Sequence, residues 1–114
     1  MKPILIEEVV KAINGCINNN VNTENLFIKG ISTDTRNIKE GDLFIPIIGE
    51  NFDGHNFIDV AFQKGAIACI SQKNINTNNL IINVADTKEA LKDLAMYYRS
   101  LFNIPVVALT GSAG

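Results

Sequence analysis

Apolar side chains recur at helical spacing in three stretches of the chain, which predicts helices over 6–14, 55–64 and 88–102. The three stripes are Ile6, Val9, Val10 and Ile13; Phe57, Ile58, Ala61 and Phe62; and Leu91, Leu94, Ala95, Tyr98 and Leu101. Residues suited to cap these helices are Gly15 and Gly65 at the C-termini of the first two, and Asp86 or Thr87 at the N-terminus of the third. Each pattern is amphipathic, so each helix is expected to pack one face on a core.

Short apolar runs of strand length occur at 27–33, 43–48, 66–71, 80–84 and 106–110. The asparagine-rich segment 16–27 predicts a hairpin or an irregular β connection. Pro46 cannot donate to a ladder, so a bulge or an edge is expected at that point. Strands that alternate with helices favour an α/β fold with a small mixed sheet and flanking helices. We expect the sheet to be mixed because the early strands are separated by turns too short for helical crossovers.

The composition is that of one folded domain, with 114 residues, 46% hydrophobic and 19% charged. A formal net charge of −2 leaves no basic surplus for nucleic acid or an anionic membrane. No apolar run reaches the roughly 20 residues that span a bilayer, and no signal-peptide pattern is present, so a cytoplasmic protein is expected. Cys16 and Cys69 lie far apart beside a single histidine in the whole chain, which predicts two buried thiols, no disulfide and no metal site.

Polar side chains concentrate in 30–55, and the first cluster there is Ser32, Thr33, Asp34, Thr35 and Arg36. Hydroxyl and carboxylate groups in such a run can satisfy the amides of a turn and can also contact a ligand. The planar guanidinium of Arg36 suits a phosphate or a carboxylate. The alternative is a solvated turn in which Asp34 pairs with Arg36 or with a nearby amide.

A second polar turn, 49–55, combines glycines with Asn51, Phe52 and Asp53. The amide of Asn51 could pair with a base edge, and the ring of Phe52 could stack on a planar ring, a combination that suits uracil. The alternative is that Phe52 packs against the next helix while Asp53 caps it. If the two turns lie at matching ends of neighbouring strands, they form one polar rim around a binding site.

The last apolar run leads directly into the glycine-rich turn TGSAG. A strand followed by such a turn is how phosphate-binding α/β units begin, because backbone amides there can surround a phosphate. The turn lacks the lysine and hydroxyl pair that would complete a phosphate loop.

The segments STDTR, GDLF, GENFDGHNFI with AFQKGA, and PVVALTGSAG together resemble the beginning of the Mur ligases of peptidoglycan synthesis. The resemblance implies that 1–104 form an N-terminal domain binding the UDP end of a UDP-muramoyl peptide. It implies that 105–114 form the first strand and the start of the phosphate loop of a central ATPase domain. By the same resemblance, the residues that contact UDP are Ser32, Thr33, Asp34, Thr35, Arg36, Glu50, Asn51 and Phe52, and those of the partial ATP loop are Gly111, Ser112 and Gly114.

The TGS turn and its approach YYRSLFNIPVVAL are most similar to the members that add D-Ala-D-Ala to UDP-N-acetylmuramoyl-tripeptide, with ATP and Mg²⁺. The members that form the tripeptide are the alternative within the family. Because the phosphate-loop lysine is absent, no catalytic residue is expected in this chain, and the 114 residues alone are expected to be inactive. Outside the family, the alternative is a free-standing interaction domain that uses the same rim for a protein partner.

Overall fold

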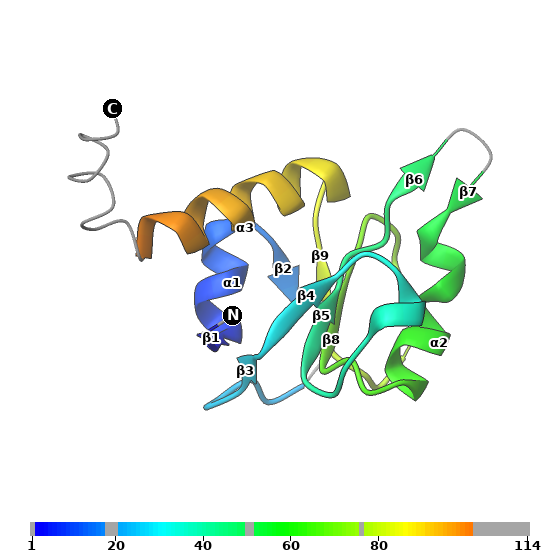
Figure 1. Cartoon of the computed structure of the whole chain (residues 1–114), viewed down its shortest axis with the longest axis horizontal. Helices are drawn as coiled ribbons and strands as arrows, with labels where there is room; N and C mark the ends of the chain where they lie inside the picture. The colour runs from blue at the N-terminus through cyan, green and yellow to red at the C-terminus, as the bar shows by residue number, and fades with distance from the viewer. Residues whose placement is uncertain (1, 18–20, 50–51, 76, 102–114) are drawn as a thin grey trace.

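The computed structural model describes residues 2–17, 21–49, 52–75 and 77–101. Within them, a five-stranded sheet has the strand order β2-β9-β8-β5-β4 (Figure 1). Its strands are β2 (Cys16–Ile17), β4 (Gly30–Ser32), β5 (Asp42–Phe44), β8 (Ala68–Ser71) and β9 (Ile81–Asn83). β4, β5, β8 and β9 are parallel to one another in turn, whereas β2 is antiparallel to β9. The expected α/β fold with a small mixed sheet is confirmed.

Two antiparallel ribbons accompany this sheet. One pairs β1 (Ile4–Leu5) with β3 (Phe27–Ile28), and the other pairs β6 (Ile48–Gly49) with β7 (Phe52–Asp53). The helices are α1 (Ile6–Ala12), α2 (Ile58–Gln63) and α3 (Thr87–Leu101), with 3₁₀ turns η1 (Thr35–Asn37) and η2 (Gly54–Phe57). In Figure 1 the β6–β7 ribbon extends beyond one end of the sheet and leads through η2 into α2.

The helices cover the two faces of the sheet separately. Alternate strand residues point to opposite faces, so Leu43, Ile70 and Ile82 pack with α1 and α3 in one hydrophobic cluster. Phe44 and Cys69 point the other way and pack with α2 in a second cluster. The sheet therefore has a hydrophobic core on each face, and the sheet lies between two helical layers.

The sheet is mixed, but short turns between the early strands are not the reason, so this part of the expectation is wrong. β4 and β5 are parallel neighbours, although residues 33–41 connect them without an α-helix. Each strand is three residues long, so the single 3₁₀ turn η1 is sufficient to return the chain to the start of β5. Ile38 in this connection packs against the α2-side cluster, which places the crossover on the same face as α2.

Several sequence expectations need local correction. The run 27–33 divides into β3 and β4, which belong to different sheets. The run 43–48 leaves the main sheet after Phe44, and Pro46 is buried at the break between β5 and β6. Segment 16–27 forms no hairpin within its described residues, because β2 pairs with β9 and β3 pairs with β1.

The two cysteines differ in exposure. Cys16 is exposed on the edge strand β2, whereas Cys69 is buried as expected.

Helix α3 forms where it was expected but packs through a shifted face. Its buried residues are Thr87, Ala90 and Leu94, while Ala95 and Leu101 of the predicted stripe are exposed. Asp86 caps the helix, since its Oδ1 accepts hydrogen bonds from the backbone N of Lys88 at 2.8 Å and of Glu89 at 3.2 Å. The Tyr97 hydroxyl donates to Glu8 Oε1 at 2.5 Å and joins α3 to α1, and this hydrogen bond raises the pKa of Tyr97.

The ends of α1 and α2 have the same geometry but different residues. After α2, Gly65 takes φ +112°, and Ala66 N donates to Ala61 O while Gly65 N donates to Phe62 O. This is a Schellman cap, as the sequence predicted. After α1, the left-handed position falls on Asn14 with φ 54° instead of on Gly15. Gly15 is needed for space, because a Cβ there would lie 2.5 Å from Cγ2 of Ile82.

These two caps predict different effects of substitution on stability. Gly65→Ala forces a side chain onto a left-handed backbone and against the Cα of Glu40, 3.0 Å away, so we expect a loss of about 1–3 kcal/mol. Asn14→Gly relieves the left-handed strain at the matched position, so we expect no loss of stability. Urea unfolding of the 114-residue chain measures both changes, and a Gly65→Ala variant as stable as wild type would contradict this account.

Candidate functional site

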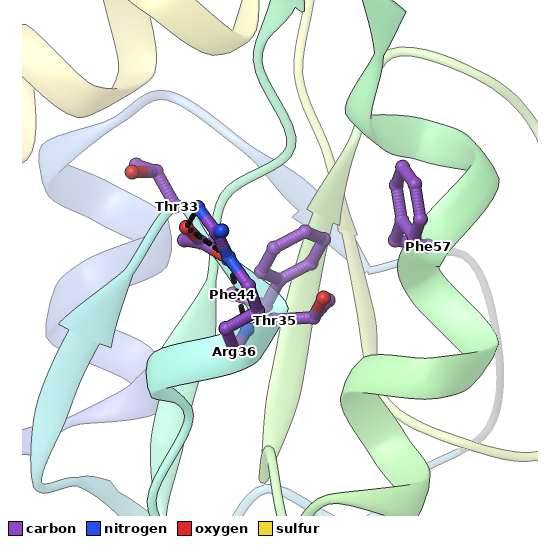
Figure 2. Close-up of a pocket in the computed structure, with 6 residues that line it drawn as sticks. Thr33, Thr35, Arg36, Phe44 and Phe57 are labelled. Carbon is purple, nitrogen blue, oxygen red and sulfur yellow. Dashed lines mark hydrogen bonds and ion pairs between the residues drawn. The ribbon is translucent and has the colours of Figure 1, made fainter.

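A pocket of about 410 Å³ lies beyond the carboxyl end of β4, on the α2 face of the sheet. The residues that line it are Thr33, Asp34, Thr35, Arg36, Phe44 and Phe57. Figure 2 shows that they come from two sides, with Thr33, Thr35 and Arg36 on the β4–η1 side, Phe57 on the η2 side and Phe44 between them. The parallel crossover and the start of the α2 layer therefore form opposite walls of one pocket.

Ser32 builds the turn at the end of β4. Its side chain is 8% exposed, and its hydroxyl donates to Asp34 O at 2.8 Å and accepts from Asp34 N at 3.2 Å. These two bonds fold the chain back on itself directly after the strand. Ser32 therefore uses its hydroxyl within the protein, while Thr33 and Thr35 line the pocket.

Asp34 and Arg36 form an ion pair at the mouth of this pocket. Arg36 Nη2 donates to Asp34 Oδ2 at 2.7 Å, and Arg36 Nε donates to both carboxylate oxygens at 3.1 Å. Asp34 is also the N-cap of η1, because its Oδ1 accepts from the backbone N of Arg36 at 2.9 Å. The pairing of Asp34 with Arg36, which was part of the solvated-turn alternative, is observed.

The pairing changes the ionisation of both groups. Hydrogen bonds from the Arg36 side chain and then from its backbone N lower the pKa of Asp34 from 3.8 to about 2, with a smaller contribution from the charge of Lys64. The same side-chain bond raises the pKa of Arg36. Both groups are therefore charged at neutral pH, and the 84% exposed side chain of Arg36 remains open to solvent.

The opposite wall depends on the base of the β6–β7 ribbon. Gly54 N donates to Ile47 O at 2.9 Å, and a Cβ at Gly54 would lie 2.8 Å from Ile47 N and 3.0 Å from the Cα of Pro46. Only glycine permits this close approach, and η2 starts at that residue. Phe57, three residues further on, lines the pocket with a 38% exposed side chain.

The structure brings together part of the predicted rim. Thr33, Asp34, Thr35 and Arg36 line the pocket, and Ser32 supports their turn. Phe52 lies in β7, but its side chain is not described, and α2 takes Phe57 instead of Asp53 as its N-cap. The remaining predicted site residues lie outside the described residues; they are Glu50, Asn51, Gly111, Ser112 and Gly114.

Sequence reasoning missed Phe44, Phe57 and Lys64 as neighbours of the site. Phe57 was assigned to the helical stripe, but it precedes α2 in a 3₁₀ turn. Its position immediately before Ile58 is a usable signal, because Ile58, Ala61 and Phe62 alone complete the i, i+3, i+4 spacing. Phe44 and Lys64 are brought to the site by the crossover and by the end of α2, for which the local pattern has no signal.

A second, more open hollow of about 660 Å³ lies on the other side of η1. Arg36 lines both hollows, and Lys29 and Lys39 line the second. Asp42, also in its lining, is 7% exposed and accepts from Lys39 N at 3.0 Å. Arg36 thus lies between the two hollows.

Over residues 2–17, 21–49, 52–75 and 77–101, no three histidine, cysteine or acidic side chains cluster as metal ligands would. Over the same ranges, no helix has the length and apolar character required to cross a membrane.

The parallel strands and this pocket define an α/β domain with a pocket at the carboxyl end of its sheet, where open α/β sheets usually bind ligands. The model of the Mur ligase family, catalytic domain, matches residues 27–107. This match covers well over half of the chain, so the chain belongs to the Mur ligase family.

The relatives include two kinds of ligase. The chain is 35% identical over 112 residues to UDP-N-acetylmuramoyl-tripeptide--D-alanyl-D-alanine ligase of Bacillus subtilis (strain 168), covering 96% of this chain and 24% of the relative. It is 41% identical over 91 residues to UDP-N-acetylmuramoyl-L-alanyl-D-glutamate--2,6-diaminopimelate ligase of Syntrophomonas wolfei, covering 76% of this chain and 19% of the relative. The chain thus spans a quarter or less of each relative.

Solved structures of the same family agree with the fold. MurF from Acinetobacter baumannii superimposes with a TM-score of 0.80 at 31% identity, over 89% of this chain and 22% of the other. MurF from Thermotoga maritima, in complex with ADP, gives a TM-score of 0.58 at 32% identity, over 68% of this chain and 18% of the other. The fold described here is therefore the fold of a MurF domain.

The Asp34–Arg36 pair predicts an acid-sensitive contact. Because the pKa of Asp34 is lowered in the folded chain, the contact contributes to stability above about pH 4 and is lost as the pH falls through about 2. An NMR titration of the Asp34 carboxyl carbon should give a pKa of about 2. Arg36→Ala should raise this pKa part of the way toward 3.8, since the backbone N of residue 36 still donates.

Lys64→Ala is the matched control for that titration, because it removes only the smallest of the causes that lower the pKa of Asp34. We expect the titration of Asp34 to be nearly unchanged in this variant. If Lys64→Ala shifts the pKa of Asp34 as much as Arg36→Ala does, or more, the charge of Lys64 and not the contact with Arg36 sets that pKa.

Proposed function

We propose that this domain binds the uridine diphosphate end of a UDP-muramoyl peptide in the pocket between η1 and η2. The observation that carries the proposal is the combination, in one pocket, of a fixed guanidinium and an exposed aromatic ring, contributed by Arg36 and Phe57. A guanidinium suits a phosphate, and an aromatic ring can stack on a flat base.

The dimensions and chemistry of the pocket support this ligand. Its volume of about 410 Å³ falls within the range of small-molecule sites, about 300–1,000 Å³. Arg36 has five N–H groups, and its pairing with Asp34 engages the Nε hydrogen and one Nη2 hydrogen, so three are left for the oxygens of a diphosphate. The hydroxyls of Thr33 and Thr35 can complete the contacts to phosphate or ribose.

For the whole protein, we infer an ATP-dependent amide ligase that adds D-Ala-D-Ala to UDP-N-acetylmuramoyl-tripeptide. Relatives that match most of this chain carry the name of that ligase, and this supports the substrate pair. ATP and Mg²⁺ would act in a central domain that begins with residues 105–114, and Gly111, Ser112 and Gly114 would start its phosphate loop. The division at residue 104, the inactivity of the isolated chain and its cytoplasmic location stay predictions.

A diaminopimelate-adding ligase is the second candidate, because relatives of that kind match at comparable identity. Both candidates would bind UDP, so this pocket does not separate them. Incubating the intact protein with ATP and each substrate pair separates them: amide formation between D-Ala-D-Ala and the muramoyl tripeptide supports the first, and addition of diaminopimelate to the muramoyl dipeptide supports the second.

UDP binding can be located directly by NMR. Titration of the 114-residue chain with UDP should shift the amide signals of residues 32–36 and 54–57, because these segments form the two walls of the pocket. The family resemblance predicts shifts at residues 50–52 as well. NMR detects binding even at millimolar affinity, which suits a single domain that lacks the contacts of the rest of the ligase. Shifts confined to other regions would refute the proposed site.

The role of the aromatic ring predicts a selective loss of affinity. Phe57→Ala should weaken UDP binding by about 1–3 kcal/mol if the base stacks on this ring. Phe27→Ala is the matched control, because Phe27 on β3 is similarly exposed at 44% and is not a lining residue of the pocket. Equal affinities of the two variants for UDP would argue against stacking on Phe57.

A further inference from the structure

We propose that Asp34 is a positioning residue, which holds the Arg36 guanidinium at the pocket and does not itself contact the ligand. This proposal rests on the proposed function for the identity of the ligand, a nucleoside diphosphate. It differs from the sequence expectation, in which Asp34 was one of the UDP contacts: of the two paired residues, only Arg36 contacts the ligand.

The hydrogen bonds of Asp34 carry the argument. Oδ1 accepts from the backbone N and the Nε of Arg36, and Oδ2 accepts from Nε and Nη2. A carboxylate offers about four acceptor sites in total. Each oxygen thus already has two donors, so a ribose hydroxyl could bind Asp34 only by displacing Arg36.

The charges lead to the same assignment. An unpaired carboxylate beside a diphosphate would repel it, whereas the Asp34–Arg36 pair as a whole carries almost no net charge. The pairing also fixes a long and otherwise mobile side chain, 84% exposed, before any ligand arrives. Fixing such a side chain in advance removes an entropic cost from binding. Asp34 therefore helps an anionic ligand through Arg36, despite its own negative charge.

The first test needs no ligand. The heteronuclear NOE of the arginine Nε–H groups reports how rigid each guanidinium is, and the chain has two arginines, Arg36 and Arg99. Arg99 is the internal control, because the described part of the chain gives it no ion pair. We expect a rigid Arg36 beside a mobile Arg99 in the wild-type chain. In Asp34→Asn, which keeps an oxygen to cap η1, Arg36 should become as mobile as Arg99.

The second test is a double-mutant cycle with UDP as the probe, on Asp34→Ala, Arg36→Ala and the double variant. Asp34→Ala alone should weaken UDP binding about threefold to tenfold, the cost of ordering one long side chain on binding. In the Arg36→Ala background the same substitution should not weaken binding further, because Asp34 has nothing left to position. Uridine without phosphate should bind wild type and Asp34→Ala equally.

The outcomes separate this proposal from the proposed function. If wild type does not bind UDP, the proposed function fails. If wild type binds UDP but the two substitutions weaken binding additively, or Asp34→Ala also weakens uridine, Asp34 contacts the ligand and only the positioning role is overturned. An Arg36 side chain as mobile as Arg99 in the wild-type chain overturns the positioning role whether or not UDP binds.

Discussion

The parallel pairing of β4 with β5 is the constraint on which the site depends. Parallel neighbours require the chain to return from the end of one strand to the start of the next across a face of the sheet. Here residues 33–41 make that return on the α2 face, anchored by Ile38 in the α2-side core and by the bond from Gly41 N to Gly65 O. If the two strands were antiparallel, the polar turn would lie at the sheet edge and could not face η2 across Phe44.

The second wall of the pocket depends on a different constraint, the buried Pro46, where the chain leaves the main sheet between β5 and β6. After this residue the chain leaves the main sheet for the β6–β7 ribbon and returns at Gly54, whose lack of a side chain lets it contact Ile47 and Pro46 closely. That contact fixes the start of η2, and η2 carries Phe57. The pocket is thus formed by two connections that leave the carboxyl ends of β4 and β5, the usual place for ligands in open α/β sheets.

Sequence patterns predicted the elements better than their pairing. The helices and strands expected within the described residues are present there, because burial on one face leaves a periodic signal. The strand expected at 106–110 lies outside the described residues. Strand partners leave no such signal, so β4 and β5 were not expected to be parallel, and β3 was not separated from β4. The shifted face of α3 has the same origin, because its contacts with α1 depend on tertiary packing that spacing alone does not encode.

Within the site, the sequence identified the polar residues but did not show which of them build the turn and which are available to contact a ligand. The motif STDTR reads as a row of ligand contacts, yet the structure gives Ser32 and Asp34 hydrogen bonds that are satisfied inside the turn. Short polar side chains two residues apart can bond to each other's backbone, which closes a turn without any ligand. The longer and more exposed groups are then left for recognition, and Arg36 has the most donors among them. A polar motif at a strand end therefore combines residues that build the turn with residues that the turn presents.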